Sequence, residues 1–271
     1  MSQPGHSIGM SDAEFQHIVA IAASEAGLAI PETKKSLVQS RVARRMRALG
    51  LETCATYLSA LSHDTDETQH LISALTTNVS HFFRERHHFD HIRDMLQAGL
   101  GQRRWRFWSA GCSNGQEPYS LAMEIAATLK DSAQRDIRIL ATDIDHSVLK
   151  KAKAGIYDSG EIDGVPPDKR SAFLEHQTDG SYKVKKSIQD MVKFGKLNLN
   201  ADGWPMKGPF NAIMCRNVVI YFDEGTQSRL WPRFHRLLEP GGILMLGHSE
   251  RIHPLAGSGF EAVGVTTYRR I

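Results

Sequence analysis

The segment WSAGCSNGQEPYSLAM, residues 108–123, joins the end of a strand to the start of a helix through a turn that contains two glycines. Its first residues close an apolar run that begins at Trp105, and Pro118 suits the first turn of a helix. The turn has no Lys-Ser/Thr pair, as a Walker loop would, and the spacing of Gly111 and Gly115 does not fit G-x-G-x-x-G. The segment therefore predicts a ligand cradle, but not one of these two phosphate-binding kinds.

Strand-like and helix-like segments alternate from Trp105 to the C-terminal region. Strands are expected in RRWRFWSA, DIRILATDID, FNAIMCRNVVIYF and GGILMLGH, and helices are expected after Pro118, from Ser147 and around residues 230–238. This alternation is typical of α/β proteins whose sheet is parallel and covered by helices on both faces. We therefore predict a doubly wound, Rossmann-like sheet.

The alternation is interrupted at about residues 156–194. There VPPDKRSAFLEH is expected to form a short helix, and QTDGSYKVKK is expected to form a hairpin in which Asp179-Gly180 closes a two-residue turn. We therefore predict a small β-subdomain that is inserted into the larger domain, which spans residues 88–271.

Residues 1–87 are predicted to form an all-helical N-terminal domain. Ser11 to Glu14 fits a capping box ahead of a first helix, and a second helix is expected between Pro31 and Gly50. One flank of the second helix carries a basic stripe, which consists of Lys34, Arg41, Arg44 and Arg45. The stripe is either a solvated face or a surface for an acidic partner, and the sequence leaves both interpretations open.

Composition disfavours several classes of protein. The formal net charge of +3 over 271 residues is too small to indicate a nucleic-acid binder. The three cysteines, Cys54, Cys112 and Cys215, show neither metal-type spacing nor a disulfide framework, which favours a reducing compartment. The N-terminus lacks a signal-peptide pattern, and no apolar run approaches the roughly 20 residues that span a bilayer. We therefore expect a cytoplasmic protein without direct membrane insertion.

Two acidic residues follow the expected strands at the edge where an open parallel sheet binds its ligands, beyond the carboxyl ends of the strands. Asp143 follows the second strand, where a carboxylate can accept hydrogen bonds from both hydroxyls of an adenosine ribose. Glu117 lies in the turn after the first strand and offers a partner for an ammonium group. A nucleoside with an amino-acid tail, such as S-adenosylmethionine, fits this pair. Either acid can also be an ordinary cap or first-turn charge of a helix.

Further segments extend this pattern, namely TTNVSHFFRE, the PYS turn, ATDID, Asn198-Leu199 and LLEPGGILMLGHSE. With them, the sequence from about Asp12 to the C-terminus closely resembles the chemotaxis receptor methyltransferases of the CheR family. The resemblance implies a methyltransferase sheet that binds S-adenosylmethionine. It also implies an enzyme that converts glutamate side chains on the cytoplasmic helical bundle of chemoreceptors into methyl esters and releases S-adenosylhomocysteine.

The resemblance implies functions for individual residues. The cofactor contacts would be Asn78, Ser80, Arg84, Glu117, Asp143, Asn198, Leu199, Arg216 and Asn217. Arg84 and Tyr221 would lie closest to the transferred methyl group. We expect the basic stripe, through Arg41, Arg44 and Arg45, to contact the receptor. Asn114 and Gln116 replace the Thr and Glu that are common in the family's glycine turn, so we expect Glu117 to make the ionic contact.

The implied reaction needs no general base. A glutamate with an ordinary pKa near 4.3 is already an anion at neutral pH and can attack a sulfonium methyl group directly. Arg84 can hold a carboxylate through two parallel hydrogen bonds. Cys112 has no adjacent base and is expected to be a packing residue. The histidines between residues 81 and 91 suggest a metal site, but no third ligand of matching spacing follows, so we expect no metal.

Two alternative functions remain, a methyltransferase for another protein or for nucleic acid, and a non-catalytic module that binds the cofactor. The absence of an Asn-Pro-Pro-Tyr motif disfavours nucleic acid. Some members of the resembled family dock a pentapeptide from the receptor's C-terminus on the inserted subdomain. Because a two-residue turn at Asp179-Gly180 leaves little backbone to embrace a peptide, we predict that this protein needs no such tether.

Overall fold

The computed structural model describes residues 9–76, 78–255 and 258–271. The chain divides into two compact units, of which the first contains the described residues up to 76 together with residues 221–223. The second contains residues 78–220 and 224–271, so residues 78–87, which we expected in the helical domain, belong to the second unit. Within the described ranges, none of the helices combines the length and the apolar composition that crossing a bilayer requires.

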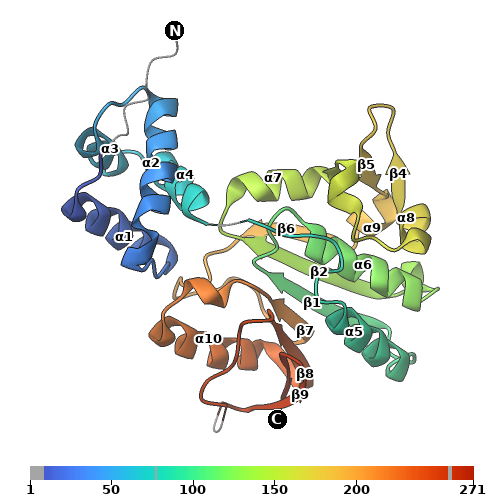
Figure 1. The fold of residues 1–271 in the computed structure, drawn as a ribbon. Coiled ribbons are helices and arrows are strands. Elements are labelled where there is room, and N and C mark those ends of the chain that lie inside the picture. Colours follow the sequence, from blue (N-terminus) through green and yellow to red (C-terminus); the bar gives the residue numbers. More distant parts are fainter. Residues whose placement is uncertain (1–8, 77, 256–257) are drawn as a thin grey trace. The chain divides into compact units, whose positions relative to one another are not determined.

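The first unit is all-helical, as predicted. Its helices are α1 (Asp12–Ala26), α2 (Lys35–Leu49), α3 (Cys54–Leu61) and α4 (Thr65–Leu75), with a 3₁₀ turn at Glu32–Lys34 (Figure 1). The capping box of Ser11 and Glu14 begins α1, and Gly27 and Gly50 end α1 and α2 in the left-handed conformation. The apolar faces form the core of this unit through Phe15, Ile18, Val38, Val42, Met46, Tyr57, Leu71 and Ile72.

A buried polar triad joins three of these helices. The Tyr57 hydroxyl donates to Oε1 of Glu67 at 2.7 Å, and Arg45 donates to both oxygens of Glu67 at 3.0 and 2.5 Å. Glu67 is only 2% exposed, so both partners are needed to stabilise its charge. Arg45, which we expected on a receptor-binding stripe, therefore stabilises the fold of the unit.

The second unit is an α/β domain. Its helices are α5 (His87–Ala98), α6 (Gln116–Thr128), α7 (His146–Ala154), α8 (Pro167–Phe173), α9 (Lys186–Gln189) and α10 (Glu224–Leu237). Its strands are β1 (Arg104–Ala110), β2 (Asp136–Asp143), β3 (Ile156–Tyr157), β4 (Leu174–His176), β5 (Tyr182–Val184), β6 (Val192–Lys196), β7 (Phe210–Cys215), β8 (Leu238–Leu246), β9 (Phe260–Gly264) and β10 (Thr267–Arg270).

The seven-stranded sheet has the order β6-β2-β1-β7-β8-β10-β9. The chain runs outward from β1 through β2 to β6, then returns to the other side of β1 with β7 and continues to β8. The strand order therefore reverses between β1 and β7. In open α/β sheets, the crevice at such a reversal is where ligands bind.

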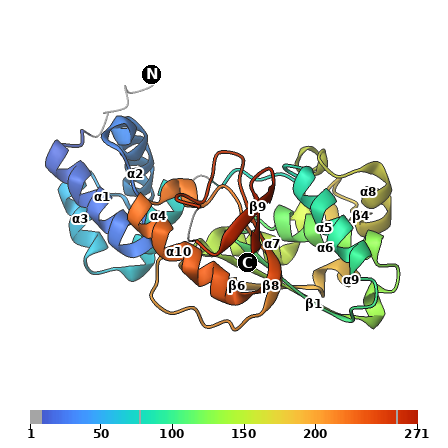
Figure 2. The same cartoon turned by 90° about the horizontal axis from the view of Figure 1, so that it is seen from below.

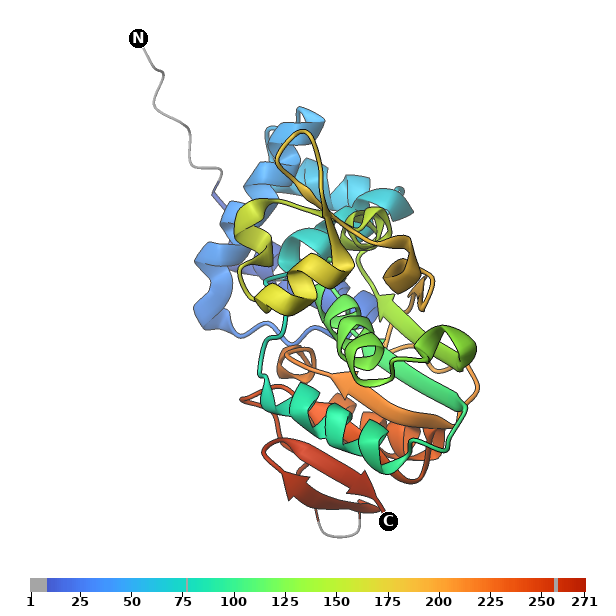
Figure 3. The same cartoon turned by 90° about the vertical axis from the view of Figure 1, so that its right-hand side faces the viewer.

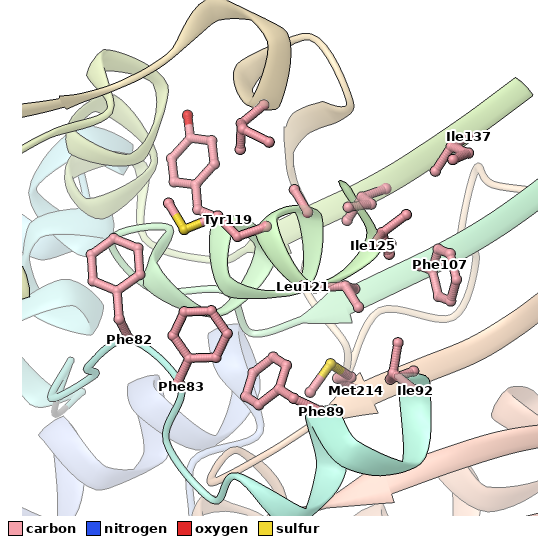
Figure 4. Close-up of a cluster of buried hydrophobic side chains, with 14 of the residues drawn as sticks. Phe82, Phe83, Phe89, Ile92, Phe107, Tyr119, Leu121, Ile125, Ile137 and Met214 are labelled. Atoms are coloured by element: carbon pink, nitrogen blue, oxygen red, sulfur yellow. The ribbon is translucent and has the colours of Figure 1, made fainter. Parts of the chain in front are cut away.

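Alternating side chains of β1 pack on opposite faces of the sheet. Phe107 belongs to a core cluster with Ile92 of α5 and Leu121 of α6, as Figure 4 shows. Trp108 points to the other face, where its ring centroid lies 5.5 Å from that of Phe234 of α10. The sheet is thus covered by α5 and α6 on one face and by α10 on the other (Figure 2), which confirms the doubly wound arrangement.

The sheet is mixed rather than parallel throughout. The pairs β6-β2, β2-β1, β1-β7 and β7-β8 are parallel, but β10 pairs antiparallel with both β8 and β9. The β9-β10 hairpin lies at one edge of the sheet (Figure 3). We did not predict these last two strands because FEAVG and TYRR are only five and four residues long, and charged residues keep either of them from forming a continuous apolar run.

The inserted β-subdomain is confirmed as a three-stranded antiparallel sheet of order β3-β5-β4. The hairpin between β4 and β5 differs from the expected two-residue turn, because Gln177 pairs with Ser181 and so encloses residues 178–180. Gly180 takes a φ of 85°, as a three-residue hairpin loop requires. The Asp179 carboxylate accepts hydrogen bonds from the backbone N–H and the hydroxyl of Ser181, which favours the longer loop.

Candidate functional site

The turn between β1 and α6 requires its glycines. Gly111 and Gly115 have φ values of 84° and 91°. A Cβ on Gly111 would lie 2.3 Å from Cγ2 of Val218, and one on Gly115 would lie 2.9 Å from Cβ of Ala152. Only glycine fits both the conformation and the space. The turn is thereby packed against α7 and against the segment that follows β7. Asp143 lies just before α7, and Arg216 and Asn217 lie in the segment after β7.

Asp143 ends β2 and is held beside this turn. Its Oδ2 accepts a hydrogen bond from the Ser113 N–H at 2.8 Å, and its Oδ1 accepts one from the Asp145 N–H at 3.0 Å. The residue is 8% exposed. Burial raises the pKa of the Asp143 carboxyl group, and these N–H groups oppose that shift. Each oxygen retains a lone pair, so an oriented carboxylate is available to accept two neighbouring hydroxyls.

Asn78 and Ser80 lie on a half-buried segment that is tied to the same turn. The side-chain amide of Asn78 donates to Oδ2 of Asp145 at 2.8 Å, and the backbone carbonyl of Asn78 accepts a hydrogen bond from the Ser113 hydroxyl at 3.3 Å. On the other side, Asn198 and Leu199 follow β6, where the Asn198 side chain accepts a hydrogen bond from the Asn200 N–H at 2.8 Å. These four predicted cofactor residues therefore lie on segments at the carboxyl edge of the sheet.

Glu117 and Arg216 form a buried ion pair across the strand-order reversal. Nη1 of Arg216 lies 3.1 Å from Oε2 of Glu117, whose other oxygen accepts a hydrogen bond from the Ser109 hydroxyl at 2.6 Å. Burial raises the pKa of the Glu117 carboxyl group, whereas the charge of Arg216 opposes this. The Arg216 side chain is only 2% exposed, so this ion pair is shielded from solvent.

Arg84 lies in the segment that leads into α5. Its side chain is 33% exposed, with Nη1 donating to the Val79 carbonyl at 3.3 Å and Nε 3.8 Å from Oε1 of Glu85. Its own carbonyl oxygen accepts a hydrogen bond from the Arg216 guanidinium. The backbone of Arg84 is therefore attached to the buried ion pair, while its side chain remains one-third exposed.

Asn217 adopts a φ of 59° at the sharp bend after β7. The bend is stabilised by Glu250, whose carboxylate accepts hydrogen bonds from the N–H groups of Asn217, Val218 and Ile220 and also from that of Gly247. Burial raises the pKa of the Glu250 carboxyl group, and these four donors oppose the shift. Glu250 thus fixes the backbone of the bend that carries Asn217.

A cluster of possible metal ligands lies beside this site. Ligand atoms of Glu85, His87 and His88 lie within 4.8 Å of one another. However, Nη2 of Arg216 lies 3.4 Å from Oε2 of Glu85, and its positive charge would repel a divalent cation there. We therefore assign no metal to the cluster.

His88 is buried in this cluster as a neutral side chain. Its Nε2 lies 3.1 Å from Oγ1 of Thr266, and its Nδ1 lies 3.6 Å from Oε2 of Glu85. Burial, together with the positive charges of Arg216, His87 and His91, lowers the pKa of His88 to about 3.

This low pKa predicts a pH-dependent stability. An unfolded histidine has a pKa near 6.5, so between pH 6.5 and the folded value of about 3 only the unfolded state binds this proton. The free energy of unfolding should therefore fall as the pH drops below about 6.5, by up to about 1.4 kcal/mol per pH unit from this group. Urea unfolding at several pH values between 7 and 5 should show a shallower slope for His88→Gln than for the wild type. The exposed His63→Gln is the control, and equal slopes for His88→Gln and the wild type would contradict the assignment.

Some predicted site residues lie elsewhere or have other roles. Tyr221 ends a 3₁₀ turn rather than a strand and belongs to the first unit, where its carbonyl accepts a hydrogen bond from the Ala29 N–H at 2.7 Å. Its place beside Arg84 stays a prediction. Arg41 donates to the carbonyls of the last turn of α4, at 2.7 to 3.0 Å, and thereby caps that helix. Of the three arginines assigned to receptor binding, Arg44 alone is exposed.

Sequence reasoning missed three residues that support the site, namely Ser109, Glu85 and Glu250. Glu85 and Glu250 lie in the quoted motifs TTNVSHFFRE and GHSE, but neither follows a strand directly. Their functions depend on contacts with segments 30 or more residues away, as the hydrogen bonds that Glu250 accepts from the N–H groups of Asn217, Val218 and Ile220 show. No local pattern signals such contacts.

Unpartnered polar atoms in the glycine turn support the expected cofactor. Oδ1 of Asn114 and Oε1 of Gln116 are buried and accept no hydrogen bond from any residue that the structure describes. Together with Glu117 they provide acceptors for an ammonium group at the start of α6. Asp143 provides acceptors for a ribose. These residues fit S-adenosylmethionine, and the replacement of a glutamate by Gln116 leaves the acceptor oxygen in place.

Comparison with known sequences agrees with this geometry. The family described as "CheR methyltransferase, SAM binding domain" matches residues 78–269, and "CheR methyltransferase, all-alpha domain" matches residues 13–76. The chain is 43% identical over 256 residues to the "Probable chemotaxis protein methyltransferase" of Rhizobium etli, covering 91% of this chain and 95% of that protein. It is 39% identical over 266 residues to the "Chemotaxis protein methyltransferase" of Escherichia coli, with coverages of 96% and 92%. The chain therefore belongs to the CheR methyltransferase family and is an S-adenosylmethionine-dependent methyltransferase.

Proposed function

We propose that this methyltransferase forms methyl esters on glutamate side chains of the cytoplasmic helical bundle of chemoreceptors, with S-adenosylhomocysteine as the second product. The observation that carries the proposal is the match to both CheR domains over nearly the whole chain. The site agrees with it, because an accessible guanidinium lies next to the residues suited to the cofactor. The reaction then takes place in the cytoplasm, where that bundle lies.

The site performs its chemistry by orientation and charge. Bound S-adenosylmethionine supplies a methyl group on a positively charged sulfur. Arg84 binds the incoming carboxylate, which is already ionised, and aligns one of its oxygens with that methyl group. Cys112 takes no part as a nucleophile, because it is buried and burial raises the pKa of its thiol far above neutrality. A dry, oriented site then favours the neutralisation of opposite charges.

Transfer of labelled methyl groups tests this proposal. The purified protein should label the signalling domain of a chemoreceptor in the presence of radiolabelled S-adenosylmethionine, and mild base should release the label as methanol. A receptor domain whose acceptor glutamates are changed to glutamine is the control and should stay unlabelled. Base-stable label, or transfer to nucleic acid instead of the receptor, would contradict the proposal and support another substrate class.

The proposed receptor surface combines Arg44 of the basic stripe with Arg47, an arginine of α2 that lies outside the stripe as defined above. Arg44 and Arg47 are exposed on α2, unlike Arg41 and Arg45. We propose that Arg44 and Arg47 attract acidic side chains of the receptor helices. This proposed surface leaves out Arg41 and Arg45, because their side chains bind other groups within the first unit.

Charge reversal tests this surface. The double variant Arg44→Glu/Arg47→Glu should lower kcat/KM for receptor methylation about tenfold at low salt and less than about twofold near 0.5 M salt, because salt screens long-range attraction. The affinity for S-adenosylmethionine should not change. Lys153→Glu/Lys193→Glu, at exposed positions of the second unit, is the matched control. A defect of the same size at all salt concentrations would point to misfolding and contradict the electrostatic surface.

We also propose that receptor methylation needs no C-terminal peptide tether. The hairpin loop has only residues 178–180 beyond the Gln177–Ser181 pair, and the edge strand β4 has three residues. A peptide that adds to β4 as a strand would gain few backbone hydrogen bonds.

Receptor truncation tests the absence of a tether. A receptor with its last residues and the same receptor without them should be methylated at rates within about twofold of each other, because docking on β4 contributes little. A peptide that ends in an aromatic tether sequence should show no binding at micromolar concentration by calorimetry. Micromolar binding together with a large loss on truncation would show that the subdomain captures receptor tails.

A further inference from the structure

The segment that carries Arg84 has a strained backbone. Phe83 and Glu85, on either side of Arg84, have φ values of 54° and 56°. Residues with a Cβ seldom adopt this left-handed conformation, and it persists only where surrounding contacts enforce it. The contacts that hold Phe83 and Glu85 therefore determine where the Arg84 guanidinium lies.

Phe83 is anchored on the α6 side. Its N–H donates to the Ser120 hydroxyl at 2.9 Å, and its ring is buried with those of Phe82 and Phe89. Figure 4 shows Phe82 and Phe83 directed into the cluster that includes Leu121 of α6. This end of the segment is therefore fixed by apolar packing and by one buried hydrogen bond.

Glu85 anchors the other end through its carboxylate. Oε1 accepts a hydrogen bond from the His248 N–H at 3.1 Å and lies 3.8 Å from Nε of Arg84. Oε2 lies 3.4 Å from Nη2 of Arg216. One carboxylate thus contacts the segment after β8, the buried Arg216 after β7 and the partly exposed guanidinium of Arg84. Its side chain is only 12% exposed, so solvent cannot replace these partners.

We propose that Glu85 is a positioning residue for methyl transfer, which holds the Arg84 segment in its strained conformation and orients the Arg84 guanidinium toward the acceptor carboxylate. This inference rests on the proposed function, because it assumes that Arg84 binds the acceptor. Glu85 itself does not touch the substrate. Its effect on the reaction passes through Arg84.

A double-mutant cycle in the full-length protein tests this dependence. Glu85→Gln keeps the size of the side chain and an oxygen for the His248 N–H but removes the charge that attracts both arginines. In the wild-type background it should lower kcat about tenfold, with the receptor KM within about twofold, because orientation matters most in the transition state. In an Arg84→Ala background the same change should lower kcat less than twofold, because the residue that it positions is absent.

Controls separate positioning from a general loss of structure. Glu261→Gln removes an exposed acid that pairs with Arg269 in the same unit, and it should leave kcat unchanged. Thermal unfolding and S-adenosylmethionine binding are measured for every variant. Independent, multiplicative losses in the cycle, or an unchanged kcat for Glu85→Gln, would overturn the proposal. If the wild type does not methylate the receptor domain at all, the proposed function fails, and that result is distinct from either outcome of the cycle.

Discussion

Arg84→Ala should lower kcat for receptor methylation about 100-fold or more, while it weakens S-adenosylmethionine binding less than tenfold. The guanidinium is one-third exposed and its backbone is attached to Arg216, so it can reach an incoming carboxylate from a fixed base. A contact that matters for alignment is strongest in the transition state, and its loss lowers the rate more than the affinity. Steady-state kinetics together with calorimetry of cofactor binding would measure both quantities.

A lysine at the same position distinguishes geometry from charge. Arg84→Lys should recover little of the lost rate, because an ammonium group cannot form two parallel hydrogen bonds to a carboxylate. Arg86→Ala, at an exposed arginine two positions further along the chain, is the matched control and should retain nearly full activity. Full activity of Arg84→Lys would show that only a positive charge is required.

Asp143→Ala should weaken S-adenosylmethionine binding by about tenfold to a hundredfold, which corresponds to about one to three kcal/mol for a charged hydrogen bond in a buried site. The N–H groups of Ser113 and Asp145 already orient the carboxylate. Cofactor binding therefore does not have to immobilise this side chain, and no conformational entropy is lost there. Calorimetry on the variant, after its thermal unfolding has shown that it is folded, measures the effect. Unchanged affinity in a folded variant would remove Asp143 from the cofactor site.

Acidification provides a second measurement at the same residue. Because burial raises the pKa of Asp143, its carboxylate should take up a proton at a higher pH than an ordinary aspartate, whose pKa is about 3.9. Cofactor affinity should therefore decline as the pH is lowered from 7, before ordinary carboxylates titrate. Asp143→Asn cannot ionise and should bind more weakly at pH 7 but show a smaller decline. Glu117, whose pKa burial also raises, contributes the remaining pH dependence.

Several residues of the candidate site could be brought together from the sequence because they follow strands directly. Asp143 ends β2 and Arg216 follows β7, and parallel strands bring their carboxyl ends to one edge whatever the details of packing. The glycine turn before α6 could also be predicted from the sequence. Its two glycines are required by local conformation and by close approach, both of which act on the residue itself.

Other features depended on contacts that no local pattern encodes. The periodicity of α2 places Arg41, Arg44 and Arg45 on one flank, but it does not reveal that Glu67 and the end of α4 lie opposite two of them. The hairpin loop was predicted one residue too short, because the hydrogen bonds of Asp179 to Ser181 were not anticipated. Tertiary contacts decided each of these cases.

The first unit is not a continuous stretch of sequence, and this affects how domains of relatives can be recombined. Residues 221–223 belong to it, where Phe222 forms a β-bridge with Leu28 and the Tyr221 carbonyl accepts a hydrogen bond from Ala29. In a chimera that joins the first 76 residues of one relative to the remainder of another, the residue equivalent to Leu28 would come from one protein. The residue equivalent to Phe222 would come from the other, so the two sides of the bridge would not have evolved together. Exchange of receptor preference between relatives should therefore succeed more often when the short 221–223 segment is transplanted with the helices.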